Sequence, residues 1–285
     1  MNADRIWLLD KPTGIGSRNL VDLAVKKTRI KGLGHTGTLD PHASGLLILV
    51  GGNLKKLQEF FTTLPKTYDA VIELGAETET DDQETPPVPY PNAVIPSKDE
   101  LERALATLVG EIRQKPPAYS AVKIHGERAY KLARAGQEVK LPERTVRIYE
   151  IKLHEYAYPT LSLTIRCSAG TYIRTLARDL GVSLSVGGYL KALRRVTVGS
   201  FEVRDALQPE QLAPNTGLSL EQTLIPYPRL DLPLELWQKL ANGQRLRLTQ
   251  AIPQGHLFVW VTGCVVAIAT GEDNFLIPKR LIKEL

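Results

Sequence analysis

Asp40 is the residue in this sequence whose surroundings point most clearly to chemistry. It lies in the loop 32–45, which is rich in glycine and small residues that let a backbone approach a ligand closely. The apolar run 46–50 follows the loop and is typical of a buried strand that anchors it. Loops held on rigid elements often carry catalytic groups, so Asp40 is a candidate catalytic carboxylate. The alternative is an ordinary Asp-Pro turn at the surface.

Two arginines lie behind a glycine turn in the second half of the chain. Arg174 and Arg178 follow Gly170 and are four residues apart, so on a helix they would share one face. A guanidinium near the start of that helix could pair with a carboxylate elsewhere in the chain. The alternative is a basic face in contact with solvent.

Several tyrosines stand out: Tyr119, Tyr130 and Tyr172 lie among basic residues, and Tyr68 is followed by Asp69. Aromatic rings on which bases stack, next to cations that meet phosphates, suit the binding of RNA. Tyrosines within strands can equally serve for packing, so this pattern favours RNA only in combination with others.

Motifs of other chemistries do not occur in the sequence. The segment 11–17 contains glycines but matches neither a phosphate-binding loop nor a dinucleotide fingerprint. The five histidines have no metal-ligand spacing, and no nucleophile elbow is present. Cys167 and Cys264 are far apart in alternating apolar patterns, which favours reduced thiols over a disulfide. We therefore expect no metal and no cofactor.

The order of the expected elements predicts an α+β fold with a mixed sheet, because strands and helices do not alternate strictly. The expected strands are 6–9, 46–50, 67–74, 146–155, 161–167 and 196–203. The expected helices are 17–28 capped by Ser17, 53–61 capped by Asn53, 97–109 with a capping box, 127–135, and 171–180 ended by Gly181. The stretch 77–96 is acidic and proline-rich and predicts a surface loop, and 190–195 predicts a partly helical segment.

Recurring prolines between residues 208 and 233 predict a domain boundary near residue 229. Residues 1–228 would form the larger domain, and residues 229–285 a small module with one helix and several short strands. The net charge of +5 and the pI of about 9.1 permit nucleic-acid binding without requiring it. No apolar run is long enough to cross a bilayer and the N-terminus lacks a signal-peptide layout, so we expect a cytoplasmic protein without a membrane.

Taken together, the motifs resemble one family, the bacterial tRNA pseudouridine-55 synthases of the TruB type. The octet 34–41 is similar to the catalytic motif of that family, and the blocks around it occur in the family's order. These blocks are Lys11-Pro12-x-Gly14 with Ser17, Lys66-x-Tyr68 with Leu74-Gly75, Pro116-Pro117-x-Tyr119-Ser120-Ala121-x-Lys123, Ser168-x-Gly170-Thr171-Tyr172-Ile173-Arg174 and Leu193-Arg194-Arg195. The resemblance spans residues 5 to 204 and continues more faintly to the C-terminus.

The resemblance implies a pseudouridine synthase catalytic domain with a mixed, mainly antiparallel sheet flanked by helices, and a C-terminal RNA-binding module of the PUA type. It implies that Asp40 is the nucleophile, that Arg174 pairs with it, in the bidentate manner open to a guanidinium, and that Tyr68 stacks on a flipped uracil and is a candidate for the base that removes the C5 proton. Tyr172 and Leu193 would shape the pocket, and His35 would contact the RNA.

The implied substrate is the T stem-loop of tRNA, on which an insertion at about 116–145 would close. The reaction is an isomerisation that needs no cofactor, and a monomer without a protein partner is expected. The chain departs from the family pattern at Gly16, at Ala169 and after the acidic stretch 80–84, and these departures bear on RNA affinity more than on chemistry. Alternatives from other classes are an idle RNA-binding or tRNA-folding protein, a related synthase acting on another RNA, and a small-molecule lyase.

Overall fold

The computed structural model describes residues 4–120, 122–124, 126–137, 139, 141–223 and 228–282. Within them, a nine-stranded sheet has the order β1-β3-β12-β4-β11-β10-β7, with β2 paired to β3 and β13 to β12. The bounds of these strands are β1 Ile6–Lys11, β2 Gly34–His35, β3 Ser44–Val50, β4 Lys66–Leu74, β7 Gly110–Gln114, β10 Arg144–Ala157, β11 Thr160–Cys167, β12 Gly188–Val198 and β13 Phe201–Glu202. All neighbours are antiparallel except β3 and β12. The predicted mixed, mainly antiparallel sheet is confirmed.

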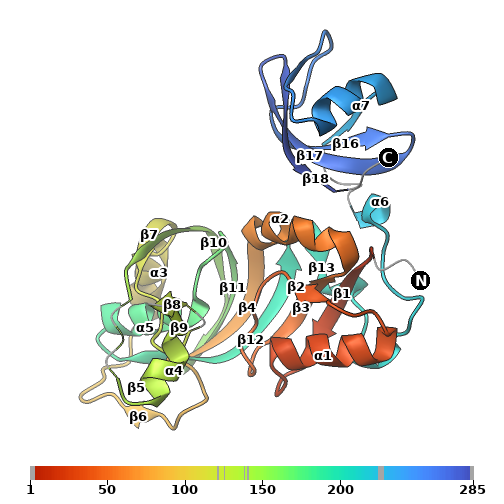
Figure 1. Cartoon of the computed structure of the whole chain (residues 1–285). Helices are drawn as coiled ribbons and strands as arrows, with labels where there is room; N and C mark the ends of the chain where they lie inside the picture. The colour runs from red at the N-terminus through yellow and green to blue at the C-terminus, as the bar shows by residue number, and fades with distance from the viewer. Residues whose placement is uncertain are drawn as a thin grey trace.

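Helices lie against both halves of the large sheet (Figure 1). Their bounds are α1 Ser17–Thr28, the 3-10 helix η1 Gly52–Leu57, α2 Gln58–Thr63, α3 Lys98–Thr107, α4 Ala129–Arg134, α5 Ile173–Ser183 and α6 Leu220–Thr223. Two short 3-10 helices, η2 Val203–Asp205 and η3 Pro209–Gln211, lie between β13 and α6. Helices α3 and α5 pack on β4, β10 and β11 over one apolar core, and α1 packs on β1 and β3 over another.

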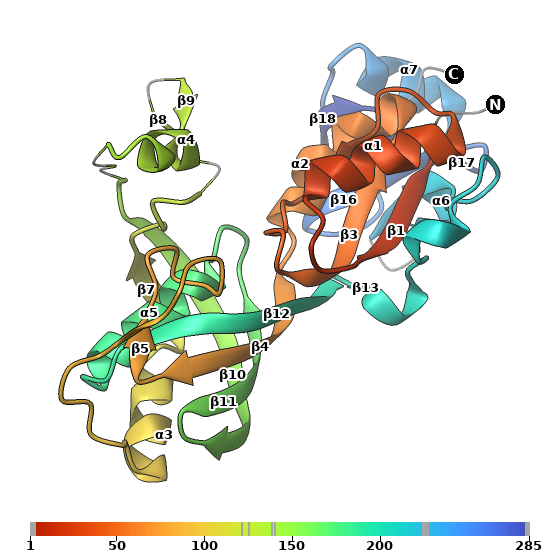
Figure 2. The same ribbon diagram turned by 90° about the horizontal axis from the view of Figure 1, so that it is seen from below.

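Strands β4 and β12 run through both halves of the large sheet and connect them (Figure 2). The short hairpins β5–β6 (Ala76–Glu77, Val88–Pro89) and β8–β9 (Lys123–Ile124, Glu127–Arg128) lie outside this sheet, and β8, β9 and α4 project from it. The long strands thus carry side chains from distant parts of the chain to one place.

The C-terminal residues form a separate five-stranded sheet of order β14-β16-β17-β18-β15, with α7 against it. The bounds are β14 Arg229–Asp231, α7 Leu234–Ala241, β15 Leu246–Arg247, β16 Gly255–Val261, β17 Cys264–Glu272 and β18 Phe275–Leu281. Phe60 of α2 packs edge-on against Phe258 of β16, with ring centroids 5.1 Å apart. The α+β class and the β-rich C-terminal module are confirmed.

Several expected elements have different bounds. The segment 190–195 is part of the continuous strand β12, not helical, because its edges pair with β4 and β3. Helix α5 continues through Gly181, which does not end it. A Cβ at Gly181 would lie 2.2 Å from the backbone of Gly187, so the glycine permits the returning chain to pack closely.

The N-caps of the helices differ from prediction in two of three cases. Gly16 is the N-cap of α1, and Gly51 precedes the 3-10 helix η1, so neither Ser17 nor Asn53 caps. The capping box of Ser97 and Glu100 is confirmed. The acidic stretch 77–96 is only partly a surface loop, since Thr80 and Asp82 are buried. Both cysteines are free.

Candidate active site

The loop that carries Asp40 is fixed by buried side chains from β1 and α1. Ser17 Oγ donates to the carbonyl of Leu39 and accepts from its N–H, both at 2.8 Å. Lys11 Nζ donates to the carbonyls of Pro12, at 2.8 Å, and Ile15, at 2.7 Å, and also reaches that of Pro41. Buried backbone groups need such partners, so these contacts determine where the residue between Leu39 and Pro41 points.

Arg174 at the start of α5 faces Asp40, as the resemblance implied. Nε of Arg174 lies 3.0 Å from Oδ2 of Asp40, while the arginine side chain is 5% exposed and the aspartate side chain 38%. The cation is therefore buried, whereas the carboxylate stays partly exposed and accessible to a ligand.

The guanidinium does not bind Asp40 in the expected bidentate manner. Its other two nitrogens donate to backbone carbonyls, Nη1 to Thr80 and Nη2 to Tyr119, each at 3.0 Å. Nη1 also lies 3.5 Å from Oδ2 of the buried Asp82. Arg174 is thus held from three directions, and only Nε is directed to Asp40. Nε makes no hydrogen bond among the described residues, so its contact with Asp40 is an ion pair.

Two opposing effects act on the pKa of Asp40. The surrounding protein raises the pKa above its ordinary value because it disfavours the charged form, and Arg174 counteracts this. The neighbouring acids Asp82 and Glu84 raise the pKa of Asp40 further. Without the arginine the carboxylate would lose its main stabilising neighbour.

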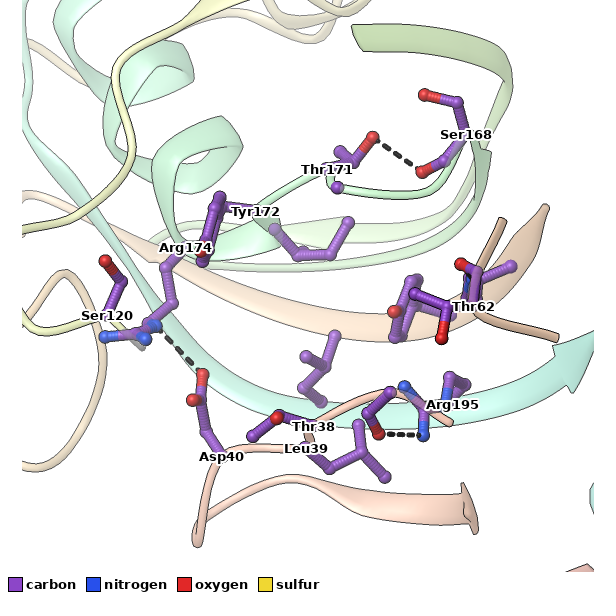
Figure 3. A pocket seen from close by; sticks show the side chains of 16 residues that line it. Thr38, Leu39, Asp40, Thr62, Ser120, Ser168, Thr171, Tyr172, Arg174 and Arg195 are labelled. Carbon is purple, nitrogen blue, oxygen red and sulfur yellow. Dashed lines mark hydrogen bonds and ion pairs between the residues drawn. The ribbon is translucent and has the colours of Figure 1, made fainter. Parts of the chain in front are cut away.

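Asp40 and Arg174 lie at one end of a cavity of about 240 Å³ (Figure 3). Tyr68, Tyr172 and Leu193 line the same cavity, from β4, the turn before α5, and β12. The structure therefore brings together five of the six site residues singled out in the sequence. An aromatic and apolar wall faces an ionisable carboxylate, an arrangement suited to a flat, uncharged ring.

Tyr172 is held in place by two residues from neighbouring strands. Gln114 is fully buried, and its side chain accepts from the N–H of Tyr172 at 3.1 Å and donates to the carbonyl at 3.3 Å. The guanidinium of Arg144 lies over the tyrosine ring, 5.1 Å from its centroid. The position of this aromatic wall is therefore set by contacts outside the cavity.

Two buried cations line the end of the cavity away from Asp40. Arg195 is 2% exposed, and it donates to the carbonyls of Leu46, at 2.7 Å, and Gly37, at 3.1 Å. Lys66 donates to two carbonyls at the end of α2, and burial lowers its pKa to about 8. Burial raises the pKa of Tyr68, and Arg195 counteracts this, so the phenol stays protonated at neutral pH.

His35 lines a second, outer hollow of about 540 Å³ and not the cavity itself. Its Nδ1 is buried without a hydrogen-bond partner among the described residues, and burial lowers its pKa. Arg18 of α1 and Arg134 of α4 line the same hollow, together with Tyr119 and Tyr130. The basic and aromatic segment predicted to clamp RNA thus faces this hollow; its residues 121, 125, 138 and 140 lie outside the described part of the chain.

The roles of Arg195, Gln114 and Asp82 are not evident from the sequence. Arg195 stands in a recognisable block, but nothing in the sequence distinguishes a buried arginine from an exposed one. Gln114 belongs to no recognisable motif. Asp82 lies in a stretch that reads as solvent-exposed, and only the fold brings it to Arg174. Arg178, for which a solvated face was the alternative, pairs with Asp81 at 2.9 Å.

Two family models match adjoining parts of the sequence. Residues 25–173 match the TruB family pseudouridylate synthase N-terminal domain, and residues 174–227 match the tRNA pseudouridylate synthase B C-terminal domain. A tRNA pseudouridine synthase B of Xanthomonas campestris pv. campestris is 38% identical and covers 98% of this chain and 94% of its own. One from Azoarcus sp. is 36% identical over 98% of this chain and 95% of its own.

The chain belongs to the TruB family of pseudouridylate synthases. It is therefore an isomerase that converts uridine to pseudouridine. Two solved structures share the fold: a Cbf5-Nop10-Gar1 complex (TM-score 0.74, 20% identity, 99% of this chain and 85% of that one) and an H/ACA RNP bound to a substrate RNA containing 2'-deoxyuridine (TM-score 0.72, 18% identity, 98% and 85%). None of the described helices is both long and apolar enough to cross a membrane.

Proposed function

We propose that this protein isomerises the uridine at position 55 in the T stem-loop of tRNA, with Asp40 as the nucleophile. The observation that carries the proposal is the ion pair of Asp40 and Arg174 at the mouth of an aromatic cavity. The printed names of the curated relatives, which are tRNA pseudouridine synthases, support tRNA as the substrate. Position 55 is what the resemblance of the motifs to the TruB family implies.

The reaction breaks the bond between C1′ and N1 and forms one between C1′ and C5 of the same base. The C5 proton leaves and N1 gains a proton, so no group donor and no net redox change is involved. A carboxylate can assist by adding covalently, either to the base or to C1′, and in both cases it must be ionised. Arg174 contributes by favouring the ionised form of Asp40.

Tyr68 is proposed to stack on the uracil, with Tyr172 and Leu193 forming the rest of the wall. As the base that removes the C5 proton, Tyr68 would have to act from a phenol whose pKa burial raises, and Arg195 is the neighbour that makes this less costly. His35, on the outer side, is proposed to contact the RNA and to help hold the extruded nucleotide.

A uridine stacked in a folded loop cannot reach Asp40, so it must be extruded, which costs on the order of a few kcal/mol. We propose that the segment 116–145 closes on the T stem-loop and supplies phosphate contacts that offset this cost. We further propose that residues 1–228 form the catalytic domain and 229–285 a PUA-like RNA-binding module. The family models end at residue 227, and the second sheet begins at Arg229, which supports this division.

We propose that the protein acts as a cytoplasmic monomer without a protein partner or cofactor. The test is to incubate purified protein with tRNA transcripts without additives and to map pseudouridine at single-nucleotide resolution. Pseudouridine at position 55 is expected. Its absence from position 55, with modification elsewhere or none, would refute the proposed substrate.

A further inference from the structure

The inner cavity and the outer hollow share a small set of wall residues. These residues, which line both, are Thr38, Leu39, Asp40, Ser120 and Arg174. They form the boundary between an aromatic compartment and a basic one. Figure 3 shows Ser120, Arg174 and Asp40 together at one end of the inner cavity, away from Thr62 and Arg195.

A nucleotide bound at Asp40 must straddle this boundary. The base matches the inner wall of Tyr68, Tyr172 and Leu193, and the flanking phosphates match the outer arginines Arg18 and Arg134. The ribose connects the two parts, so it must lie at the boundary. The C1′ atom then falls beside Asp40, which is compatible with addition of the carboxylate either to C1′ or to the adjoining base.

Ser120 is an unusual boundary residue because its hydroxyl group has no partner. The residue is 3% exposed, and Ser120 Oγ makes no hydrogen bond within the described part of the chain. The carbonyl of Ser120 accepts from the N–H of Tyr130 in α4 at 3.0 Å, and the carbonyl of the preceding Tyr119 accepts from Arg174 at the cavity wall. Buried polar side chains are nearly always hydrogen-bonded. A buried hydroxyl group without a protein partner at the edge of a ligand site therefore indicates that a ligand atom is its partner. Thr38, the other hydroxyl at the boundary, is exposed to solvent.

We propose that Ser120 Oγ hydrogen-bonds the ribose 2′-hydroxyl of the target nucleotide and so positions C1′ against Asp40. Within an RNA chain the 3′ oxygen is esterified, and the 2′-hydroxyl is the one free hydroxyl that the sugar can offer. The contact makes the site selective for RNA over DNA at the target position. This inference rests on the proposed function, because it takes the target to be a uridine in an RNA chain.

The experiment compares two T-arm RNAs that differ only at the target, one with uridine and one with 2′-deoxyuridine. Their dissociation constants are measured with the Asp40→Asn protein, to suppress turnover, and with Asp40→Asn/Ser120→Ala. The deoxy substitution is expected to weaken binding to the first protein about fivefold, as for one neutral hydrogen bond. The protein with Ser120→Ala is expected to bind both RNAs equally.

Ser168→Ala in the same background is the matched control. Ser168 lines the inner cavity, but its Oγ already accepts from the N–H of Arg147, so the preference for the ribose is expected to persist. Thermal unfolding of each variant checks that the fold is intact, and Ser120→Cys, which keeps a weak donor, is expected to give an intermediate preference. If Ser120→Ala weakens both RNAs equally, or leaves the preference unchanged, the assignment is wrong. Pseudouridine mapping with unaltered protein and RNA tests the proposed function separately.

Discussion

The inner cavity and the outer hollow meet at Asp40, but they hold their positive charges differently. Four cations at or behind the inner cavity are almost fully buried, and these are Lys11, Lys66, Arg174 and Arg195. All four donate to backbone carbonyls. On the outer side, the Arg18 and Arg134 side chains are 79% and 63% exposed, and each pairs with a carboxylate.

This difference separates two tasks. The buried cations cannot move without leaving carbonyls unpaired, so they fix the loops and the electrostatic field in which Asp40 works. The exposed arginines can exchange a carboxylate for a phosphate at little cost, since exposed ion pairs contribute only about 0–1 kcal/mol. We therefore expect substitutions on the inner side to lower turnover, and substitutions on the outer side to lower affinity for RNA.

The largest expected effect is that of Asp40→Asn. The amide cannot act as a carboxylate nucleophile, so turnover is expected to fall by at least about 10⁴-fold, while RNA binding remains. Single-turnover assays and filter binding measure the two quantities. Asp69→Asn, on the exposed face of β4, makes the same chemical change outside the site and is the control. Normal turnover by Asp40→Asn would remove the basis of the inner-side comparison.

The next largest effect is expected for Arg174→Ala. Turnover is expected to fall on the order of 10²- to 10³-fold, as for loss of a preorganised charge partner. Arg174 lowers the pKa of Asp40, whereas burial raises it, so removing the arginine raises that pKa further. Activity requires the ionised acid and is lost as pH falls through its pKa. The acid limb of the pH–rate profile is therefore expected to move to higher pH.

Arg178→Ala, one turn later on α5, is the control for this shift. Arg178 pairs with Asp81 and Asp179 and does not contact Asp40, so its removal is expected to leave the acid limb in place. An unshifted limb in Arg174→Ala would mean that the arginine orients the loop at Thr80 and Tyr119 but does not set the charge of Asp40.

The strands and helices with strong local patterns could be predicted from the sequence. The alternation in β4 and β11 and the capping box of α3 are local signals, and the structure agrees with them. Only the end of strand β12, from residue 196, could be predicted, because Lys191, Arg194 and Arg195 leave its first part without apolar alternation. Its conformation depends on pairing with β4 and on a parallel contact with β3, where Gly45 lets the backbone of Arg195 pass closely.

The sequence identifies several side chains that the structure brings together, but not their geometry or all of their neighbours. Motif order identified Asp40, Tyr68 and Arg174, and the structure places them around one cavity. Arg174 contacts Thr80, Tyr119 and Asp82, all of which are more than 50 residues away from it in the chain. Such contacts leave no local trace in a single sequence.

Ser17→Ala tests whether the fixed position of the Asp40 loop matters for turnover. The substitution leaves the N–H and the carbonyl of Leu39 without their partner, which is expected to destabilise the fold by about 1–3 kcal/mol in urea unfolding. A looser loop is expected to lower turnover about tenfold with little change in RNA affinity.

Thr28→Val on the same helix is the control for this variant. Thr28 Oγ1 is also buried, and it donates to the carbonyl of Ala24 at 2.7 Å without contacting the loop. The Thr28→Val substitution is expected to lower the stability of the fold and to leave turnover intact. If both variants lower turnover in proportion to stability, positioning by Ser17 has no separate role.

The smallest effect is expected on the outer side, for Arg134→Gln. In the free protein Arg134 pairs with Glu84 at 2.9 Å, so binding a phosphate replaces one exposed partner by another and the net gain is small. Affinity for tRNA is expected to fall a few-fold, and the slope of log K against log salt by about one, with turnover of bound RNA unchanged. Arg103→Gln on α3 removes the same charge away from the hollow and is expected to leave the slope unchanged. A loss of turnover without a change in the salt slope would place Arg134 with the inner cations, and the division between the two regions would fail.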